Sequence, residues 1–106
     1  MRLIGPTDAI FDRFMPDVLD REALRAALKV MVVEICMLQI PPDRIEDDEQ
    51  LIAGRLDINS LDAIEIASAV DYAWQVWIED VRGARSIMRS IGSLAEHIAL
   101  EKGWPR

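Results

Sequence analysis

The sequence predicts an all-α domain with three main helices and one or two short ones. Three segments repeat apolar residues at intervals of three and four, which is the spacing of one face of an α-helix. No segment alternates apolar and polar residues in the way that a half-buried strand does. The chain has 106 residues, of which 51% are apolar. That length suits a single domain with a small core.

The first main helix is expected to begin after Asp17 or Asp20, either of which can cap it, and to end near Leu38. Pro41 and Pro42 then end the helical pattern. The preceding residues 1–16 are predicted to be an N-terminal extension that is partly docked through its own apolar side chains. The apolar stripe of the first helix consists of Leu24, Leu28, Met31, Ile35 and Leu38.

A polar loop is predicted over residues 43–55, with Ile45, Leu51 and Ile52 as its apolar anchors. Its acids do not have the spacing of an EF-hand, so we interpret them as solvated. The second main helix is expected to begin at Asn59 or Ser60 and to end near Trp77. Its apolar stripe is interpreted as core and consists of Leu61, Ile64, Ala67, Val70, Trp74 and Trp77.

The last main helix is expected to follow residues 78–89, which hold at most a short helix because Gly83 lowers helix propensity. Ser90 is its predicted N-cap, and the helix is expected to end near Lys102, just before Gly103. The helical domain is therefore expected to span residues 17–103, after a 1–16 extension and before a 104–106 tail. No role for Trp104 follows from the pattern.

The charge and the scarce reactive residues exclude several functions. A net charge of −7 disfavours nucleic acid as a partner and favours basic proteins. The longest apolar stretch, residues 26–40, is too short and too interrupted by charge for a membrane span. Cys36 is expected to be a buried, inert thiol, and with His97 as the only histidine we expect no triad, no metal site and no enzyme. No signal peptide is recognised, so a cytoplasmic protein is expected. A monomer is also expected.

Ser60 stands where a helix is predicted to begin. The first turn of a helix has unpaired N–H groups and a partial positive charge, so a phosphodiester on this serine would be stabilised there. The plainer interpretation of Ser60 is a helix cap. Residues 56–81 contain six acids and no Lys, Arg or His, which predicts an acidic surface that attracts a basic partner.

The segment N-S-L-D-A-I-E-I, residues 59–66, resembles the D-S-L-D-x-x-E-L signature of acyl carrier proteins. I-P-P-D-R-I at 40–45, W-I-E-D at 77–80 and M-R-S-I-G-S-L-A-E-H-I at 88–98 resemble other parts of that family in the same order. The resemblance covers residues 23–101. It implies an acyl-carrier-protein-like bundle of three main helices and a short one, in which Ser60 carries a 4′-phosphopantetheine arm.

The resemblance also implies a function. The arm would hold acyl groups as thioesters for fatty-acid, specialised-lipid or polyketide-type biosynthesis, and the chain itself would catalyse nothing. Its partners would be a phosphopantetheinyl transferase and enzymes of the ketosynthase, acyltransferase or acyl-ligase type with basic patches. The docking residues implied are Leu61, Asp62, Glu65 and Asp71. The residues that match an acyl-sheltering pocket, and are ordinary core in the alternative interpretation, are Ile64, Ala67, Val70, Ile78 and Met88.

Four positions depart from the family pattern. Asn59 replaces the Asp before the serine, Asp57 replaces a Gly two residues earlier, Arg55 replaces an acid, and Tyr72 replaces a second acid on the same helix face. These changes favour a specialised carrier. They also leave open an alternative: an unmodified helical interaction module that scaffolds or regulates an enzyme complex.

Overall fold

The computed structural model describes residues 20–78 and 86–104. These residues form three α-helices and a short 3-10 helix, η1 (Pro42–Arg44). Within the described ranges there is no strand, only an isolated bridge between Ile52 and Ile58. The predicted helical class is confirmed. The expected N-terminal extension lies outside the described residues, as does most of the segment in which a short helix was expected.

Helix α2 (Arg21–Cys36) begins at Asp20, whose carboxylate accepts a hydrogen bond from the Ala23 N–H. It ends two residues before the predicted Leu38. Met37 adopts the left-handed conformation with φ 54°, and the Leu38 N–H then donates to the Val33 carbonyl. A left-handed residue at this position is a common way to end a helix, so the chain turns before it reaches the prolines.

Helix α3 (Ser60–Trp74) is shorter than predicted. Gln75 takes the left-handed conformation with φ 55° and its N–H donates to the Asp71 carbonyl, which ends the helix. Trp77 therefore lies beyond the helix and is 61% exposed. Its assignment to the core stripe was wrong.

The inner face of α3 also differs from the predicted stripe. Leu61 and Ile64 are 71% and 62% exposed, so their assignment to the core was wrong as well. Apolar residues occur all around this helix, and two stripes with helical spacing can be drawn through them. Packing selects the other stripe. Its buried members are Ala63, Ile66, Val70, Ala73 and Trp74.

Helix α5 (Ile91–Lys102) has the bounds that were expected. Ser90 and Ser93 form a capping box at its start, and Gly103 ends it with φ 69°. The next residue, Trp104, belongs to the core, although no role was predicted for it: it is 9% exposed and its N–H donates to the Ala99 carbonyl. The Arg21 guanidinium donates to the Trp104 carbonyl and pairs with Glu96 at 3.0 Å, which joins α2 to the end of α5.

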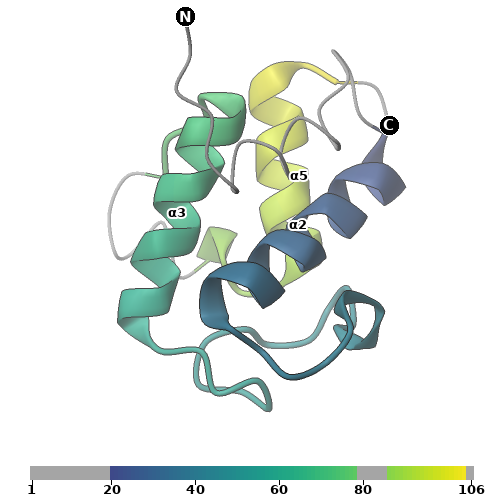
Figure 1. Ribbon diagram of the computed structural model, residues 1–106. Coiled ribbons are helices and arrows are strands. Elements are labelled where there is room, and N and C mark those ends of the chain that lie inside the picture. The colour runs from purple at the N-terminus through teal and green to yellow at the C-terminus, as the bar shows by residue number, and fades with distance from the viewer. Residues whose placement is uncertain (1–19, 79–85, 105–106) are drawn as a thin grey trace, which may run out of the picture.

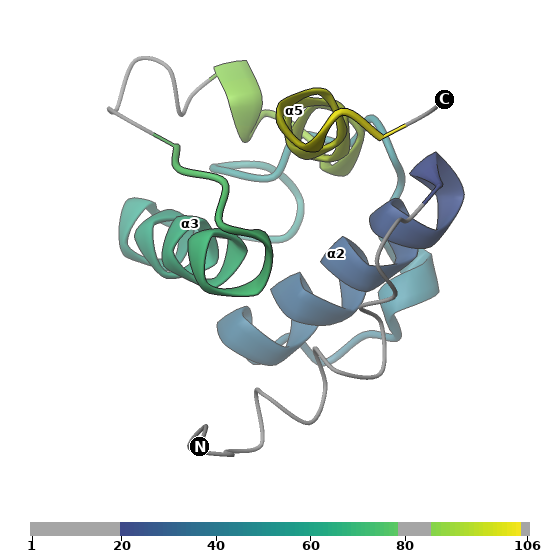
Figure 2. The ribbon, with the colours of Figure 1, turned by 90° about the horizontal axis from the view of Figure 1, so that it is seen from above.

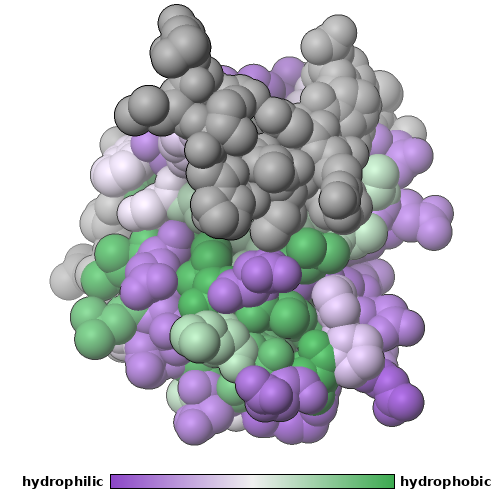
Figure 3. Space-filling view, in the orientation of Figure 1, coloured by the Kyte–Doolittle hydropathy of each residue, from purple (hydrophilic) through white to green (hydrophobic). Residues whose placement is uncertain are grey.

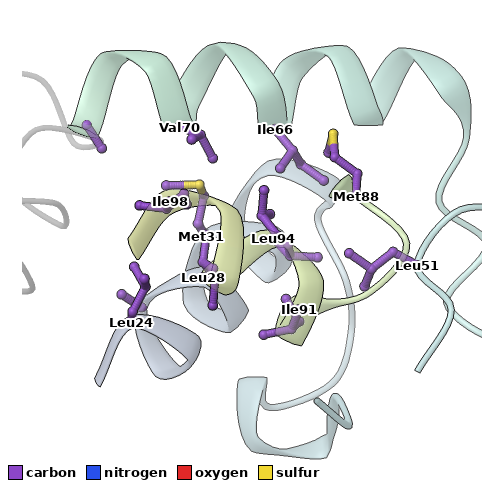
Figure 4. Packing of buried hydrophobic residues seen from close by; sticks show 14 of the residues in the cluster. Leu24, Leu28, Met31, Leu51, Ile66, Val70, Met88, Ile91, Leu94 and Ile98 are labelled. Carbon is purple, nitrogen blue, oxygen red and sulfur yellow. The ribbon is translucent and has the colours of Figure 1, made fainter. Parts of the chain in front are cut away.

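The three helices surround one core (Figures 1 and 2). α3 and α5 run in the same direction and α2 crosses beside them (Figure 1). Figure 4 shows Ile66 and Val70 of α3 pointing toward Met31 of α2 and Ile98 of α5. Each fully buried side chain of this size stabilises the fold by about 1.5–3 kcal/mol relative to an exposed one. The described helices are not long and apolar enough for any of them to cross a membrane.

The long loop between α2 and α3 is held by buried apolar side chains and by polar contacts of Asp47. Ile45, Leu51 and Ile58 are buried in the core. The Asp47 carboxylate pairs with Lys29 at 2.7 Å and with Arg25 at 3.3 Å, and the Asp47 carbonyl accepts a hydrogen bond from the Gly92 N–H at 2.7 Å. The interpretation of all the loop acids as merely solvated was therefore wrong for Asp47. This loop leads directly into the first residue of α3.

Candidate functional site

Ser60 is the first residue of α3, and its side chain is exposed. It is not the helix cap. The Asn59 side chain accepts a hydrogen bond from the Asp62 N–H at 2.9 Å, and the Asp62 carboxylate accepts one from the Asn59 N–H at 3.3 Å. Asn59 is therefore the N-cap, and the interpretation of Ser60 as a plain cap is wrong. The site thus presents an accessible hydroxyl at the positive end of a 15-residue helix.

Residues 53–58 form a tight turn that precedes Ser60. The Ala53 N–H donates to the Ile58 carbonyl, and the Asp57 N–H donates to the Gly54 carbonyl. Asp57 has φ 58°, in the left-handed region that favours glycine and that Asp tolerates better than most residues. Asp57 stands where the acyl carrier protein pattern has glycine. Asp57 therefore adopts a backbone conformation that glycine favours.

Gly54 is required for the closure of this turn. A Cβ at this position would lie 2.4 Å from the Gln50 carbonyl oxygen, which is closer than atoms can pack. The backbone of residues 50–54 thus closes on itself only with glycine at 54.

Arg55 replaces an acid of the family pattern, but its charge is neutralised within the loop. Its guanidinium donates to both carboxylate oxygens of Glu49, at 2.7 and 2.9 Å, and to the Arg44 carbonyl at 3.1 Å. The hydrogen bond from Arg55 lowers the pKa of Glu49 below its ordinary value. Arg55 consequently adds no net positive charge to the approach to Ser60.

The predicted docking residues do not all share one face of α3. Leu61 and Glu65 are exposed, and Asp62 is half-buried at the edge of the same turn. Asp71 follows Asp62 by nine residues, roughly two and a half helical turns, so it lies on the opposite side of the helix. The structure therefore brings Leu61, Asp62 and Glu65 together near Ser60 and leaves Asp71 apart.

The acids of α3 form no ion pair within the described residues, whereas three acids elsewhere in the described chain do. Asp47, Glu49 and Glu96 each pair with a Lys or Arg side chain. No ion pair within residues 20–78 and 86–104 involves Asp62, Glu65 or Asp71. Their negative charge is thus available to a partner.

The end of α2 lies beside this acidic turn. Burial raises the pKa of the Cys36 thiol to about 11, and the carboxylates of Asp62 and Glu65 contribute to the rise. The next residue, Met37, is 80% exposed. Figure 3 shows apolar and polar side chains interleaved over the part of the surface that α2 and α3 form. The exposed apolar side chains of this region are Met37, Leu61 and Ile64. Together with Ser60, Asp62 and Glu65 they form a surface that we call the α3 front.

The residues assigned to an acyl-sheltering pocket divide into two groups. Val70, Ile78 and Met88 are buried, and Ala67 is half-buried against the same core. Figure 4 places Met88 beside Ile66 on the inner side of α3. Ile64 lies on the outer side, as part of the α3 front. In the described ranges no three His, Cys, Asp or Glu side chains are grouped so that they could hold a metal ion.

Comparisons of the chain with protein-family models, with curated proteins and with solved structures find no match. The resemblance to acyl carrier proteins therefore rests on the motifs of residues 23–101 and on the surroundings of Ser60.

Proposed function

We propose that this chain is a specialised acyl carrier protein in which Ser60 bears 4′-phosphopantetheine. The observation that carries the proposal is the accessible Ser60 hydroxyl, at the start of a helix that Asn59 and Asp62 cap without it. Ordered motifs of the family on both sides of Ser60 support it. In this proposal the helices form an acyl-carrier-protein-like bundle with a short helix before α5, and the protein acts as a cytoplasmic monomer.

The residues around Ser60 fit such an arm. An exposed hydroxyl can reach a transferase without unfolding of the helix, and esterification leaves the bonds between Asn59 and Asp62 intact. The positive end of α3 stabilises a phosphodiester by about 0.3–1 kcal/mol. The arm, when attached, supplies the thiol that holds acyl groups as thioesters. The chain's own residues position the arm and shelter the cargo beside Ala67, Val70, Ile78 and Met88.

Partner enzymes are proposed to dock on the α3 front. Asp62 and Glu65 supply negative charge for basic patches, while Leu61 supplies an apolar contact beside Ser60. A carrier must leave each enzyme after delivery, so its interfaces are expected to be small and partly polar. The partners would include a phosphopantetheinyl transferase and ketosynthase, acyltransferase or acyl-ligase type enzymes.

An unmodified interaction module is the alternative, and the exposed side chains of Met37, Leu61 and Ile64 favour it. Such a surface can bind a partner without any arm. Asn59, in place of the family's Asp, is compatible with loss of recognition by a transferase. Modification of Ser60 discriminates between the two functions.

The test is the intact mass of the protein after incubation with coenzyme A, magnesium and a broad-specificity phosphopantetheinyl transferase. The wild-type chain should gain one phosphopantetheine. Ser60→Ala should gain none, whereas Ser68→Ala, which removes another exposed serine of α3, should be loaded like the wild type. Loading of Ser60→Ala would exclude the site. Absence of loading in the wild type, with a control carrier loaded in parallel, would favour the interaction module.

Docking on the α3 front is tested by charge reversal. Glu65→Lys should slow transfer of the arm by at least about tenfold at low salt, because it replaces an attractive charge with a repulsive one. The far-UV circular dichroism should be unchanged, since Glu65 is exposed. Glu101→Lys, at an exposed acid near the end of α5, is the matched control and should keep the wild-type rate. Equal rates for both variants would remove Glu65 from the docking surface.

A further inference from the structure

Exposed apolar side chains follow the outer side of α3 for most of its length. Leu61, Ile64 and Tyr72 are 71%, 62% and 53% exposed. Ser68, between Ile64 and Tyr72, is exposed as well, so the four residues follow one another at intervals of three, four and four. Val70, nine residues after Leu61, is buried and points into the core (Figure 4), so the four residues face away from the core. We call these four residues the outer stripe of α3.

The outer stripe extends over about three helical turns, or about 16 Å. Exposed apolar side chains scattered singly over a surface are ordinary, whereas anchors at intervals of three and four along one helix are the pattern by which helices contact each other. Tyr72 stands where the acyl carrier protein pattern has an acid, and it lies two residues before the end of α3 at Trp74. This departure from the pattern therefore continues the stripe into the last turn of the helix.

Acids border the outer stripe on both edges. Asp62 and Asp71 are nine residues apart, about two and a half turns, so they lie at opposite edges of the exposed side, and Glu65 lies beside Leu61. Within residues 20–78 and 86–104, none of these acids forms an ion pair, and α3 contains no Lys, Arg or His. Two copies of α3 would oppose acid to acid, which disfavours self-association through the stripe. The charge fits a basic partner.

We propose that the outer stripe of α3 binds an α-helix of a partner protein, whose own apolar stripe is bordered by Lys or Arg on both edges. The apolar stripe of such a helix has the same spacing as the outer stripe, and its bases meet Asp62 and Glu65 on one edge and Asp71 on the other. This inference rests on the proposed docking at the α3 front, and it extends that docking by about two turns to Tyr72. A contact of this length is small, which suits a partner that must be released.

The test titrates a synthetic peptide into the full-length, ¹⁵N-labelled chain at low salt. The peptide has Leu at intervals of three and four, Lys on both edges of the Leu stripe and Ala elsewhere. Amide resonances from Leu61 to Tyr72 should shift with a single dissociation constant. A control peptide with Glu in place of every Lys should bind at least about tenfold more weakly. Absence of shifts along α3, equal binding of the two peptides, or self-association of the chain through the outer stripe would overturn the proposal.

Variants of the chain separate the outer stripe from the α3 front. Leu61→Ala and Tyr72→Ala should each weaken peptide binding by about tenfold or more, whereas Leu100→Ala, at a leucine of α5 that is 60% exposed, should not. Asp71→Lys should weaken binding at low salt, and Glu101→Lys on α5 is its matched control. Wild-type binding by both Tyr72→Ala and Asp71→Lys would confine docking to the α3 front and overturn the proposal.

Loading of Ser60 reports on the carrier function separately, because the peptide is titrated into the unmodified chain. Loading of Ser60 without peptide binding would overturn the helix-binding surface and leave the carrier function standing. Peptide binding along the outer stripe without loading of Ser60 would support the helix-binding surface and favour the interaction module over the carrier.

Discussion

Three side chains have two different roles at the start of α3. Asn59 and Asp62 each accept a hydrogen bond from the backbone N–H of the other, and Ser60, between them in the sequence, keeps an exposed hydroxyl. Because the cap does not depend on Ser60, modification of this residue need not disturb the helix. The serine can therefore be functional without any loss of local stability.

Cys36 shows how the same acids affect a neighbouring residue. Its pKa is raised from 9.0 to about 11, so at pH 8 the thiolate fraction is about 100-fold lower than in the unfolded chain. Alkylation by iodoacetamide at pH 8 should be slower by about that factor in the folded protein than in urea. Glu65→Gln should speed the reaction because it removes one of the charges that oppose the thiolate, whereas Glu34→Gln should not. Equal rates in folded and unfolded protein would contradict this account.

The same shift has a consequence for stability at high pH. A group whose folded pKa is raised contributes stability that is complete below its unfolded pKa of 9.0 and is lost as pH rises toward about 11. Stability should therefore fall through this window, and Cys36→Ala should remove part of the fall.

At the scale of elements, Asn59 caps α3, whereas Ser60 does not contribute to the cap. Asn59→Ala should lower the free energy of unfolding by about 1 kcal/mol, because it removes the acceptor of the Asp62 N–H. Ser60→Ala should change it by less than about 0.5 kcal/mol, since alanine is the better helix former and no cap is lost. Urea unfolding of the two variants measures the difference. A larger loss for Ser60→Ala than for Asn59→Ala would return the capping role to Ser60.

Capping residues predicted the ends of a helix well where the sequence offers one clear candidate at each end. Ser90 and Gly103 mark both ends of α5, and the structure ends the helix at Lys102, as expected. α3 was harder to predict because apolar residues surround it, so periodicity alone did not decide between Leu61 and Ile66 as core. Its end at Gln75 also carries no Gly or Pro signal. Packing against the rest of the core buries Ile66 and leaves Leu61 exposed, and this packing is not local in the sequence.

At the scale of the whole molecule, long-range bonds hold the loop that places Ser60. Asp47 connects Lys29 and Arg25 of α2 to Gly92 of α5. The sequence presents Asp47 as one acid among five in a polar loop, and nothing local distinguishes it from Asp48. The motif around Ser60 could be recognised in the sequence because its residues are contiguous. The contacts that hold the loop before it could not be predicted, because the contacting residues are far apart in the sequence.

Asp47→Asn should lower the free energy of unfolding by about 1 kcal/mol at low salt, because two ion pairs are lost at a half-exposed carboxylate. High salt should reduce the difference, since it screens such pairs. Asp48→Asn, at an exposed acid, is the control and should stay within about 0.5 kcal/mol of the wild type. Identical unfolding curves for the two variants would show that Asp47 does not fasten the loop.

The proposed function depends on attachment of the arm to Ser60. The measurement that tests it most directly is fragmentation of the intact wild-type chain after it has been loaded by a phosphopantetheinyl transferase. If Ser60 carries the arm, the whole of the added mass should remain with fragments that contain Ser60. An adduct located on any other residue, or no adduct while a control carrier is loaded in the same reaction, would contradict it.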